Sequence, residues 1–116
     1  MKKDAIKRIA LVANLLMLAA VVRGQYANPV LNKDMPDPSV VRAPDGQFYV
    51  YATEGGGLCV PIYKSRDLAT RWRFAGSAFN SSTRPTFIKG GSIWAPDINY
   101  INGQFVLYYS MAEWGK

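Results

Sequence analysis

The feature that most constrains this chain is an internal repeat. Residues 36–51 (PDPSVVRAPDGQFYVY) and 96–109 (PDINYINGQFVLYY) both begin with Pro-Asp, continue through a short apolar run and a glycine turn, and then enter a second run through Gln-Phe. The glycines of the two turns, Gly46 and Gly103, lie 57 residues apart. A repeat of this length is typical of an array of similar supersecondary units, each of which packs on its neighbours.

Each copy of the repeat predicts a β-hairpin. Asn102-Gly103 lies between two apolar runs, and both residues tolerate the positive φ that a two-residue hairpin turn requires. Asp45-Gly46 predicts a similar, looser turn. Between the copies, residues 58–64 (LCVPIYK) and 72–79 (WRFAGSAF) are further strand candidates. Pro61 would place the first of these at a sheet edge or at a bulge, because proline cannot donate a backbone hydrogen bond.

Four strands followed by a restart of the pattern are typical of a β-propeller blade. We therefore expect an all-β fold, with blade one at about residues 36–80 and the start of blade two at about residues 92–116, and we find no helical periodicity after residue 25. Propellers contain roughly four to eight blades. The chain is thus expected to be an incomplete, N-terminal part of a propeller. A small β-sandwich that reuses one hairpin pattern is the alternative.

Residues 1–24 have the pattern of an export signal, which leaves residues 25–116 for the folded domain. A basic start is followed by the apolar run 9–22, which is shorter than the roughly 20 residues needed to span a bilayer, and by the small Gly24. The prediction is a secreted or periplasmic protein that meets the membrane only through its signal helix. An uncleaved anchor helix is the alternative. The single Cys59 cannot form an internal disulfide and is expected to be a buried small side chain.

The charge of the chain does not indicate a nucleic-acid partner. The sequence has 14 Lys and Arg against 8 Asp and Glu, a net charge of +6, but only +2 remains after residue 24. With no His and one Cys, the chain cannot build a zinc site or a Ser-His-Asp triad. No metal and no cofactor are predicted. A hydrophobic content of 49% excludes a disordered chain.

Two carboxylates of the repeat are candidate site residues. Asp37 lies between Pro36 and Pro38, so its backbone is restricted to conformations outside the α region, which suits a group that must hold a water in place. Asp97 follows Trp94 by three residues, and sugar sites combine aromatic faces with carboxylates. The repeat suggests that Asp37 and Asp97 occupy equivalent positions. The plainer interpretations are that Asp37 only starts a strand and that Trp94 only packs between blades.

Four segments, in this order, together resemble the N-terminal part of glycoside hydrolase family 43. They are Asp37-Pro38-Ser39-Val40, the hairpin 45–49, the outer strands 63–72 and Trp94-Ala95-Pro96-Asp97-Ile98. The resemblance implies a five-bladed β-propeller of the arabinanases, arabinofuranosidases and β-xylosidases, acting on arabinan- or xylan-type plant polysaccharides. Residues 92–98, with the later Tyr-Tyr-Ser at 108–110, resemble the endo-α-1,5-arabinanase branch most.

The resemblance also implies roles for individual residues. Asp37 matches the general base of an inverting mechanism, whereas Trp94 and Asp97 match a segment that lines the substrate pocket. Asp97 is not the catalytic partner of Asp37, because the family takes its pKa-setting Asp and its acid Glu from later blades, beyond Lys116. These 116 residues alone are therefore expected to be inactive. The alternatives are a non-catalytic sugar-binding propeller and a structural β-domain without a sugar site.

Overall fold

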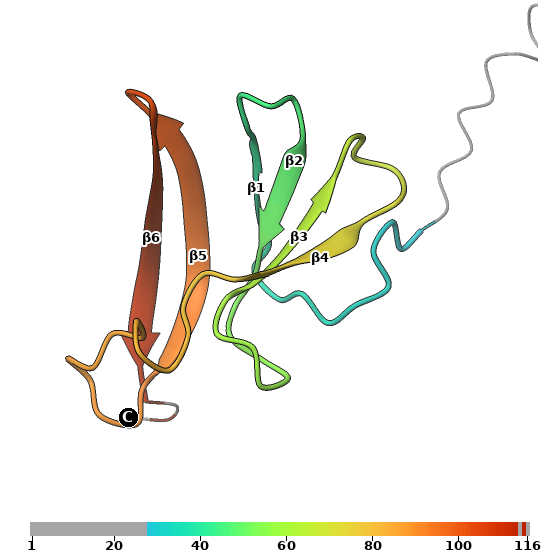
Figure 1. The fold of residues 1–116 in the computed structure, drawn as a ribbon. Coiled ribbons are helices and arrows are strands. Elements are labelled where there is room, and N and C mark those ends of the chain that lie inside the picture. Colours follow the sequence, from blue (N-terminus) through green and yellow to red (C-terminus); the bar gives the residue numbers. More distant parts are fainter. Residues whose placement is uncertain (1–27, 114, 116) are drawn as a thin grey trace, which may run out of the picture.

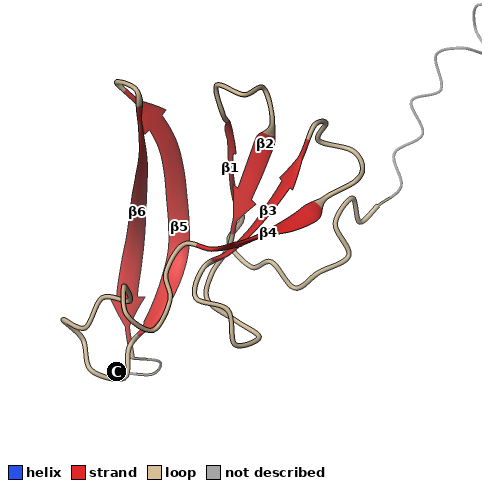
Figure 2. Cartoon of the chain, in the orientation of Figure 1, coloured by secondary structure: helices blue, strands red, loops and turns tan. Residues whose placement is uncertain are grey.

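The structure, a computed structural model, describes residues 28–113 and 115. In this part of the chain it contains six strands and no helix (Figures 1 and 2), which confirms the all-β prediction. The predicted signal helix lies outside the described residues. Within them, the structure has no helix that is long and apolar enough to cross a membrane. The strands are β1 (Ser39–Arg42), β2 (Phe48–Tyr51), β3 (Pro61–Ser65), β4 (Arg73–Ser77), β5 (Ser92–Ile101) and β6 (Gln104–Ala112).

The first four strands form one antiparallel sheet in the order β1-β2-β3-β4. The β1–β2 turn contains Gly46 with φ of 79°, as the sequence predicted for Asp45-Gly46. Pro61 begins β3, which lies between β2 and β4 and is therefore not an edge strand, so of the two predicted alternatives, edge or bulge, the structure has the second. A bulge does occur next to it, between Ile62 and Tyr63. The first position of a strand accepts proline because the missing N–H falls outside the regular ladder.

Strands β5 and β6 form a separate two-stranded sheet. Asn102 and Gly103 connect them with φ values of 51° and 83°, which confirms the two-residue hairpin predicted from the sequence. The pairing of the two strands is interrupted by a bulge between Trp94 and Asp97. This bulge lies at the end of the hairpin away from the turn, and it shapes the candidate site.

The two sheets meet where β5 packs against β1 (Figure 1). Ile93 on β5 and Val60, just before β3, are completely buried at the centre of a small core. The other buried apolar residues are Ala43, Val50, Ala52 and Ile98. Because this core is small, hydrogen bonds between the sheets contribute substantially to their relative placement.

Candidate functional site

Asp37 lies in the segment just before β1, with its side chain exposed. Its φ of 50° places the backbone in the left-handed region, a conformation that Asp tolerates better than most residues. The flanking prolines predicted a backbone outside the α region, and the structure shows a left-handed φ instead of the extended conformation usual before proline. The Oδ2 atom of Asp37 accepts a hydrogen bond of 2.7 Å from the hydroxyl of Thr53.

Thr53, which follows β2, connects Asp37 to the second sheet. Its side chain is only 5% exposed, and its Oγ1 atom also accepts a hydrogen bond of 2.8 Å from the N–H of Ala95. Its own N–H donates to the carbonyl of Pro36 at 3.0 Å. One buried hydroxyl therefore fixes the candidate base and the bulge of β5 at the same time.

The strand register corrects the predicted equivalence of Asp37 and Asp97. Ser39 lies opposite Tyr51 in the first sheet, and Asp97 lies opposite Tyr108 in the second. Because Tyr51 and Tyr108 are corresponding residues of the repeat, the residue that corresponds to Asp97 is Ser39. The two Pro-Asp pairs match in sequence letters but not in position.

The true counterpart of Asp37 is Ala95, 58 residues later. Both residues precede a proline, and both have positive φ, 50° at Asp37 and 44° at Ala95. The same bend in the backbone thus occurs in both copies, with a carboxylate at its apex only in the first. The sequence comparison missed this because a short turn in the second copy shifts the strand relative to the glycine.

Asp97 nevertheless contacts the start of β1, at Ser39, two residues after Asp37. Its Oδ1 atom is 3.4 Å from the hydroxyl of Ser39, a long hydrogen bond, and that hydroxyl accepts a bond of 3.1 Å from the N–H of Ile98. The half-buried Trp94 donates from its Nε1 atom to the carbonyl of Ala112 at 3.2 Å. Asp37 and Asp97 therefore lie on either side of the junction of β1 and β5, whereas a side-chain hydrogen bond of Trp94 joins β5 to β6. The roles of the three residues stay predictions.

A second set of polar contacts between the sheets was not predicted from the sequence. Arg84 donates to Glu54 Oε1 at 2.7 Å, to the sulfur of Cys59 at 3.0 Å and to the carbonyl of Gly91 at 2.5 Å. Glu54 Oε2 accepts from the N–H of Ile93 at 2.9 Å. We call these two charged residues, Glu54 and Arg84, the clasp. They hold the start of β5, and with it the bulge, against the first sheet.

Cys59 is half-buried rather than buried, contrary to the expectation for a small apolar side chain. Desolvation, followed by the charge of Glu54, raises the pKa of its thiol. A raised pKa disfavours the thiolate, the nucleophilic form of cysteine. Cys59 therefore acts as a structural residue that accepts a hydrogen bond from Arg84 of the clasp.

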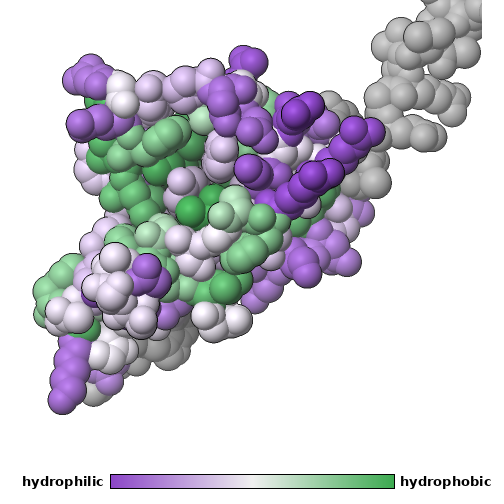
Figure 3. Space-filling model, viewed as in Figure 1, coloured by the Kyte–Doolittle hydropathy of each residue, from purple (hydrophilic) through white to green (hydrophobic). Residues whose placement is uncertain are grey.

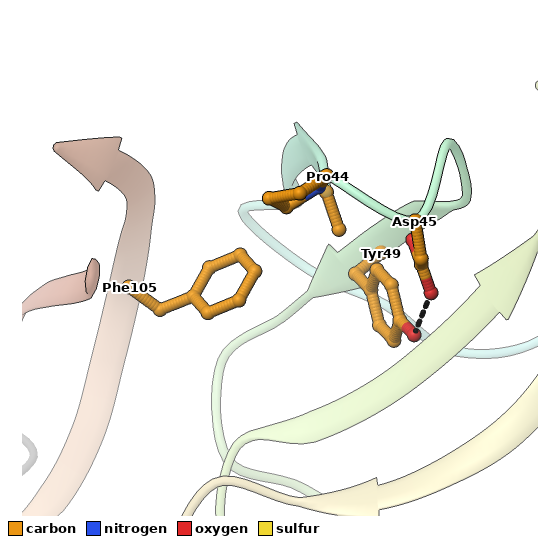
Figure 4. Close-up of a pocket in the computed structure, with 5 residues that line it drawn as sticks. Pro44, Asp45, Tyr49 and Phe105 are labelled. Carbon is orange, nitrogen blue, oxygen red and sulfur yellow. Dashed lines mark hydrogen bonds between the residues drawn. The ribbon is translucent and has the colours of Figure 1, made fainter. Parts of the chain in front are cut away.

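An apolar hollow lies away from these residues (Figure 4). It is lined by Ala43, Pro44, Asp45, Tyr49 and Phe105 and has a volume of about 420 Å³. The Tyr49 hydroxyl donates to Asp45 Oδ2 at 3.1 Å and fixes the β1–β2 turn. This hollow is at the turn end of the hairpins, opposite the end that carries Asp37, so it is not part of the candidate site.

Comparison with known proteins decides the family of this chain. The model of glycosyl hydrolases family 43 matches residues 26–116. The chain belongs to glycosyl hydrolase family 43. The resemblance seen in the sequence is therefore confirmed, over all of the chain that follows the predicted export signal.

Relatives of this family 43 chain include proteins named for arabinan hydrolysis. It is 38% identical over 89 residues to an extracellular exo-α-(1→5)-L-arabinofuranosidase of Cellvibrio japonicus. This match covers 72% of this chain and 24% of that protein. It is 31% identical over 111 residues to a probable arabinan endo-1,5-α-L-arabinosidase of Neosartorya fischeri, covering 92% and 33%. The chain thus spans between a quarter and a third of the length of these relatives.

The fold is similar to that of a solved structure. The α-L-arabinofuranosidase from Lactobacillus brevis superposes with a TM-score of 0.53 at 21% sequence identity, covering 78% of this chain and 28% of that one. At this identity the likeness concerns the fold alone.

Proposed function

We propose that this family 43 chain supplies the first part of an exported glycosidase that hydrolyses arabinan, with inversion at the sugar carbon. The family match and the names of the relatives support a glycosidase and an arabinan substrate. The observation that carries the proposal is the geometry of Asp37. It is an exposed carboxylate on a bent backbone between two prolines, anchored by one buried hydroxyl.

Asp37 is the general base of this reaction. Its Oδ2 atom is occupied by Thr53, whereas its Oδ1 atom has no hydrogen-bond partner among the described residues and is available to a water molecule. The carboxylate takes a proton from that water as the water attacks the sugar carbon, and a protonated carboxyl group on the opposite side donates to the leaving oxygen. In this proposal the acid, and the carboxylate that sets its pKa, come from residues outside these 116.

Trp94 and Asp97 line the sugar-binding surface next to the base. The contact of Asp97 with Ser39, two residues after Asp37, supports this proposal. An aromatic ring offers a face for the C–H side of a sugar, and a carboxylate accepts bonds from sugar hydroxyls. Both residues are proposed to bind substrate without taking part in proton transfer.

The substitution Asp37→Asn tests the proposal in the full-length protein, of which these 116 residues are the proposed first part. We expect hydrolysis of arabino-oligosaccharides to fall by at least about 100-fold, because a general base contributes roughly 10²–10⁴ in rate. Binding of the same oligosaccharides, measured by calorimetry, should be retained, since the amide has nearly the same shape. Asp34→Asn, an exposed aspartate three residues earlier, is the matched control and should behave as wild type.

Two other outcomes would overturn the proposal in different ways. Undiminished hydrolysis by Asp37→Asn would remove Asp37 as the base. A full-length wild-type protein that binds arabino- or xylo-oligosaccharides but hydrolyses neither would instead establish a non-catalytic sugar-binding propeller. Nuclear magnetic resonance of the first product formed would show whether the configuration at the sugar carbon is inverted.

A further inference from the structure

The hairpin between β3 and β4 carries a polar hollow unconnected with the candidate site. It has a volume of about 480 Å³, and four of its lining residues are cationic: Lys64, Arg66, Arg71 and Arg73. We call these four residues the basic hollow. On the face visible in Figure 3, the most hydrophilic residues gather over this hairpin, at the outer side of the first sheet.

The basic hollow concentrates the positive charge of the described chain. Residues 28–113 contain eight Lys and Arg and seven Asp and Glu, and half of the cations line this one hollow. Within the described residues, none of the four forms a salt bridge. The salt bridge found there joins Glu54 and Arg84 of the clasp. The rest of the described surface therefore carries more acidic than basic groups.

The one carboxylate in the hollow, Asp67, is committed to its own loop. It accepts hydrogen bonds from the N–H groups of Ala69 and Thr70 at 2.9 and 2.5 Å, and from the Thr70 hydroxyl at 3.1 Å. The bond from the Thr70 N–H is the main reason why the pKa of Asp67 lies below its ordinary value. Asp67 thus fixes the loop that presents Arg66 and Arg71.

The cations are held in positions that do not favour stability. Lys64 on β3 lies directly opposite Arg73 on β4, and like charges in such a cross-strand pair destabilise a sheet. Arg71 has φ of 57°, in the left-handed region, which costs free energy for a residue with a side chain. Two independent local costs at one hollow indicate that the charge arrangement serves binding rather than folding.

We propose that the basic hollow binds an acidic polysaccharide, a polymer whose sugars carry carboxylates. Four unpaired cations on a fixed loop and two strands match a chain of regularly spaced anions, and arginine forms paired hydrogen bonds to carboxylates. The inference rests on membership of a carbohydrate-active family and on charge complementarity, not on the assignment of Asp37. Polysaccharide is favoured over nucleic acid because the chain belongs to a carbohydrate-active family and because the lining of the hollow contains no aromatic side chain on which a base could stack.

The test measures binding of the full-length protein to three polymers: polygalacturonate, neutral linear arabinan and single-stranded DNA. We expect the double variant Arg71→Gln, Arg73→Gln to bind polygalacturonate about tenfold more weakly, because it loses the charge-assisted hydrogen bonds of two guanidinium groups. Binding of arabinan should stay unchanged. Lys33→Gln with Lys89→Gln, two exposed lysines outside the hollow, is the matched control and should bind as wild type.

Three results would overturn the inference: equal binding of polygalacturonate by the double arginine variant, an equal loss in the lysine control, or tighter binding of DNA than of polygalacturonate. The melting temperature distinguishes misfolding from lost contacts, since removing one charge of the Lys64–Arg73 pair should leave it unchanged or raise it. Asp37→Asn should bind polygalacturonate as wild type, so this inference and the proposed hydrolysis can fail separately.

Discussion

Thr53 connects the second sheet to the candidate base, Asp37, through its side-chain hydroxyl. Its hydroxyl donates to Asp37 and accepts from the N–H of Ala95, so one oxygen satisfies two partners from segments 58 residues apart in sequence. A buried hydroxyl with this pattern fixes the carboxylate in one orientation. Positioning of that kind is what a general base needs in order to hold water at a defined point.

Thr53→Val removes the hydroxyl and keeps the shape of the side chain. We expect the free energy of unfolding to fall by about 1–3 kcal/mol, because the N–H of Ala95 loses its partner in a partly buried place. In the full chain, kcat for arabino-oligosaccharides should fall with little change in KM. Thr53→Ser, which restores the hydroxyl, should recover most of both quantities. A normal kcat in Thr53→Val, measured together with urea unfolding, would show that the contact does not matter for hydrolysis.

The sequence indicated Asp37 because prolines on both sides mark its backbone, and Trp94 because an aromatic residue near a carboxylate suggests a sugar site. It gave no reason to select Thr53, since a threonine after a strand is common. It also matched Asp37 with Asp97, whereas the register pairs Asp37 with Ala95. The shorter turn of the second copy shifts its strand relative to the glycine, and this shift is visible only in the pairing of the strands.

At the scale of elements, local signals predicted the hairpins and missed what joins them. The turns at Asp45-Gly46 and Asn102-Gly103 follow from the φ values that these residues accept, which needs no tertiary information. The inner position of β3 and the clasp depend on contacts between distant segments. Glu54 and Arg84 are 30 residues apart, with no periodic spacing that would connect them.

Glu54→Gln tests the contribution of the clasp. The amide cannot accept at both of its terminal atoms, so either the Arg84 guanidinium or the N–H of Ile93 loses its acceptor. We expect the free energy of unfolding to fall by about 1–3 kcal/mol. Asp34→Asn, which removes an exposed carboxylate outside the clasp, should leave it unchanged. Equal stability of wild type and Glu54→Gln in urea titrations would mean that apolar packing of Ile93 alone holds β5 in place.

At the scale of the whole molecule, the two sheets leave much apolar surface exposed. The second sheet carries Tyr100, Ile101, Phe105 and Tyr108, each at least 42% exposed. By the strand register, Tyr100 and Phe105 lie on one face of this sheet, and Ile101 and Tyr108 lie on the other. Large apolar side chains exposed on both faces of a two-stranded sheet indicate packing against further structure. The sequence predicted repeated units that need neighbours, but two copies of a repeat do not define how many units a closed propeller would contain.

Residues 25–116 produced alone should therefore self-associate and should not hydrolyse arabino-oligosaccharides. Unpaired strand edges and exposed aromatic side chains favour association, and the piece contains one of the three carboxylates implied by the family. Light scattering after size exclusion and dye binding would measure the first effect, and a reducing-sugar assay the second. A single monomeric species with a sharp, reversible thermal transition would contradict the propeller assignment.

The repeated left-handed bend has a consequence for protein engineering. Asp37 and Ala95 are at the apex of the same backbone shape, each followed by proline, so this shape forms with or without a carboxylate at its apex. Aspartate suits a left-handed residue better than alanine does. Ala95→Asp would thus place a second carboxylate at the matching point of the second hairpin without a change to the turn. The repeated bend is a position where a functional side chain can be added by a single substitution.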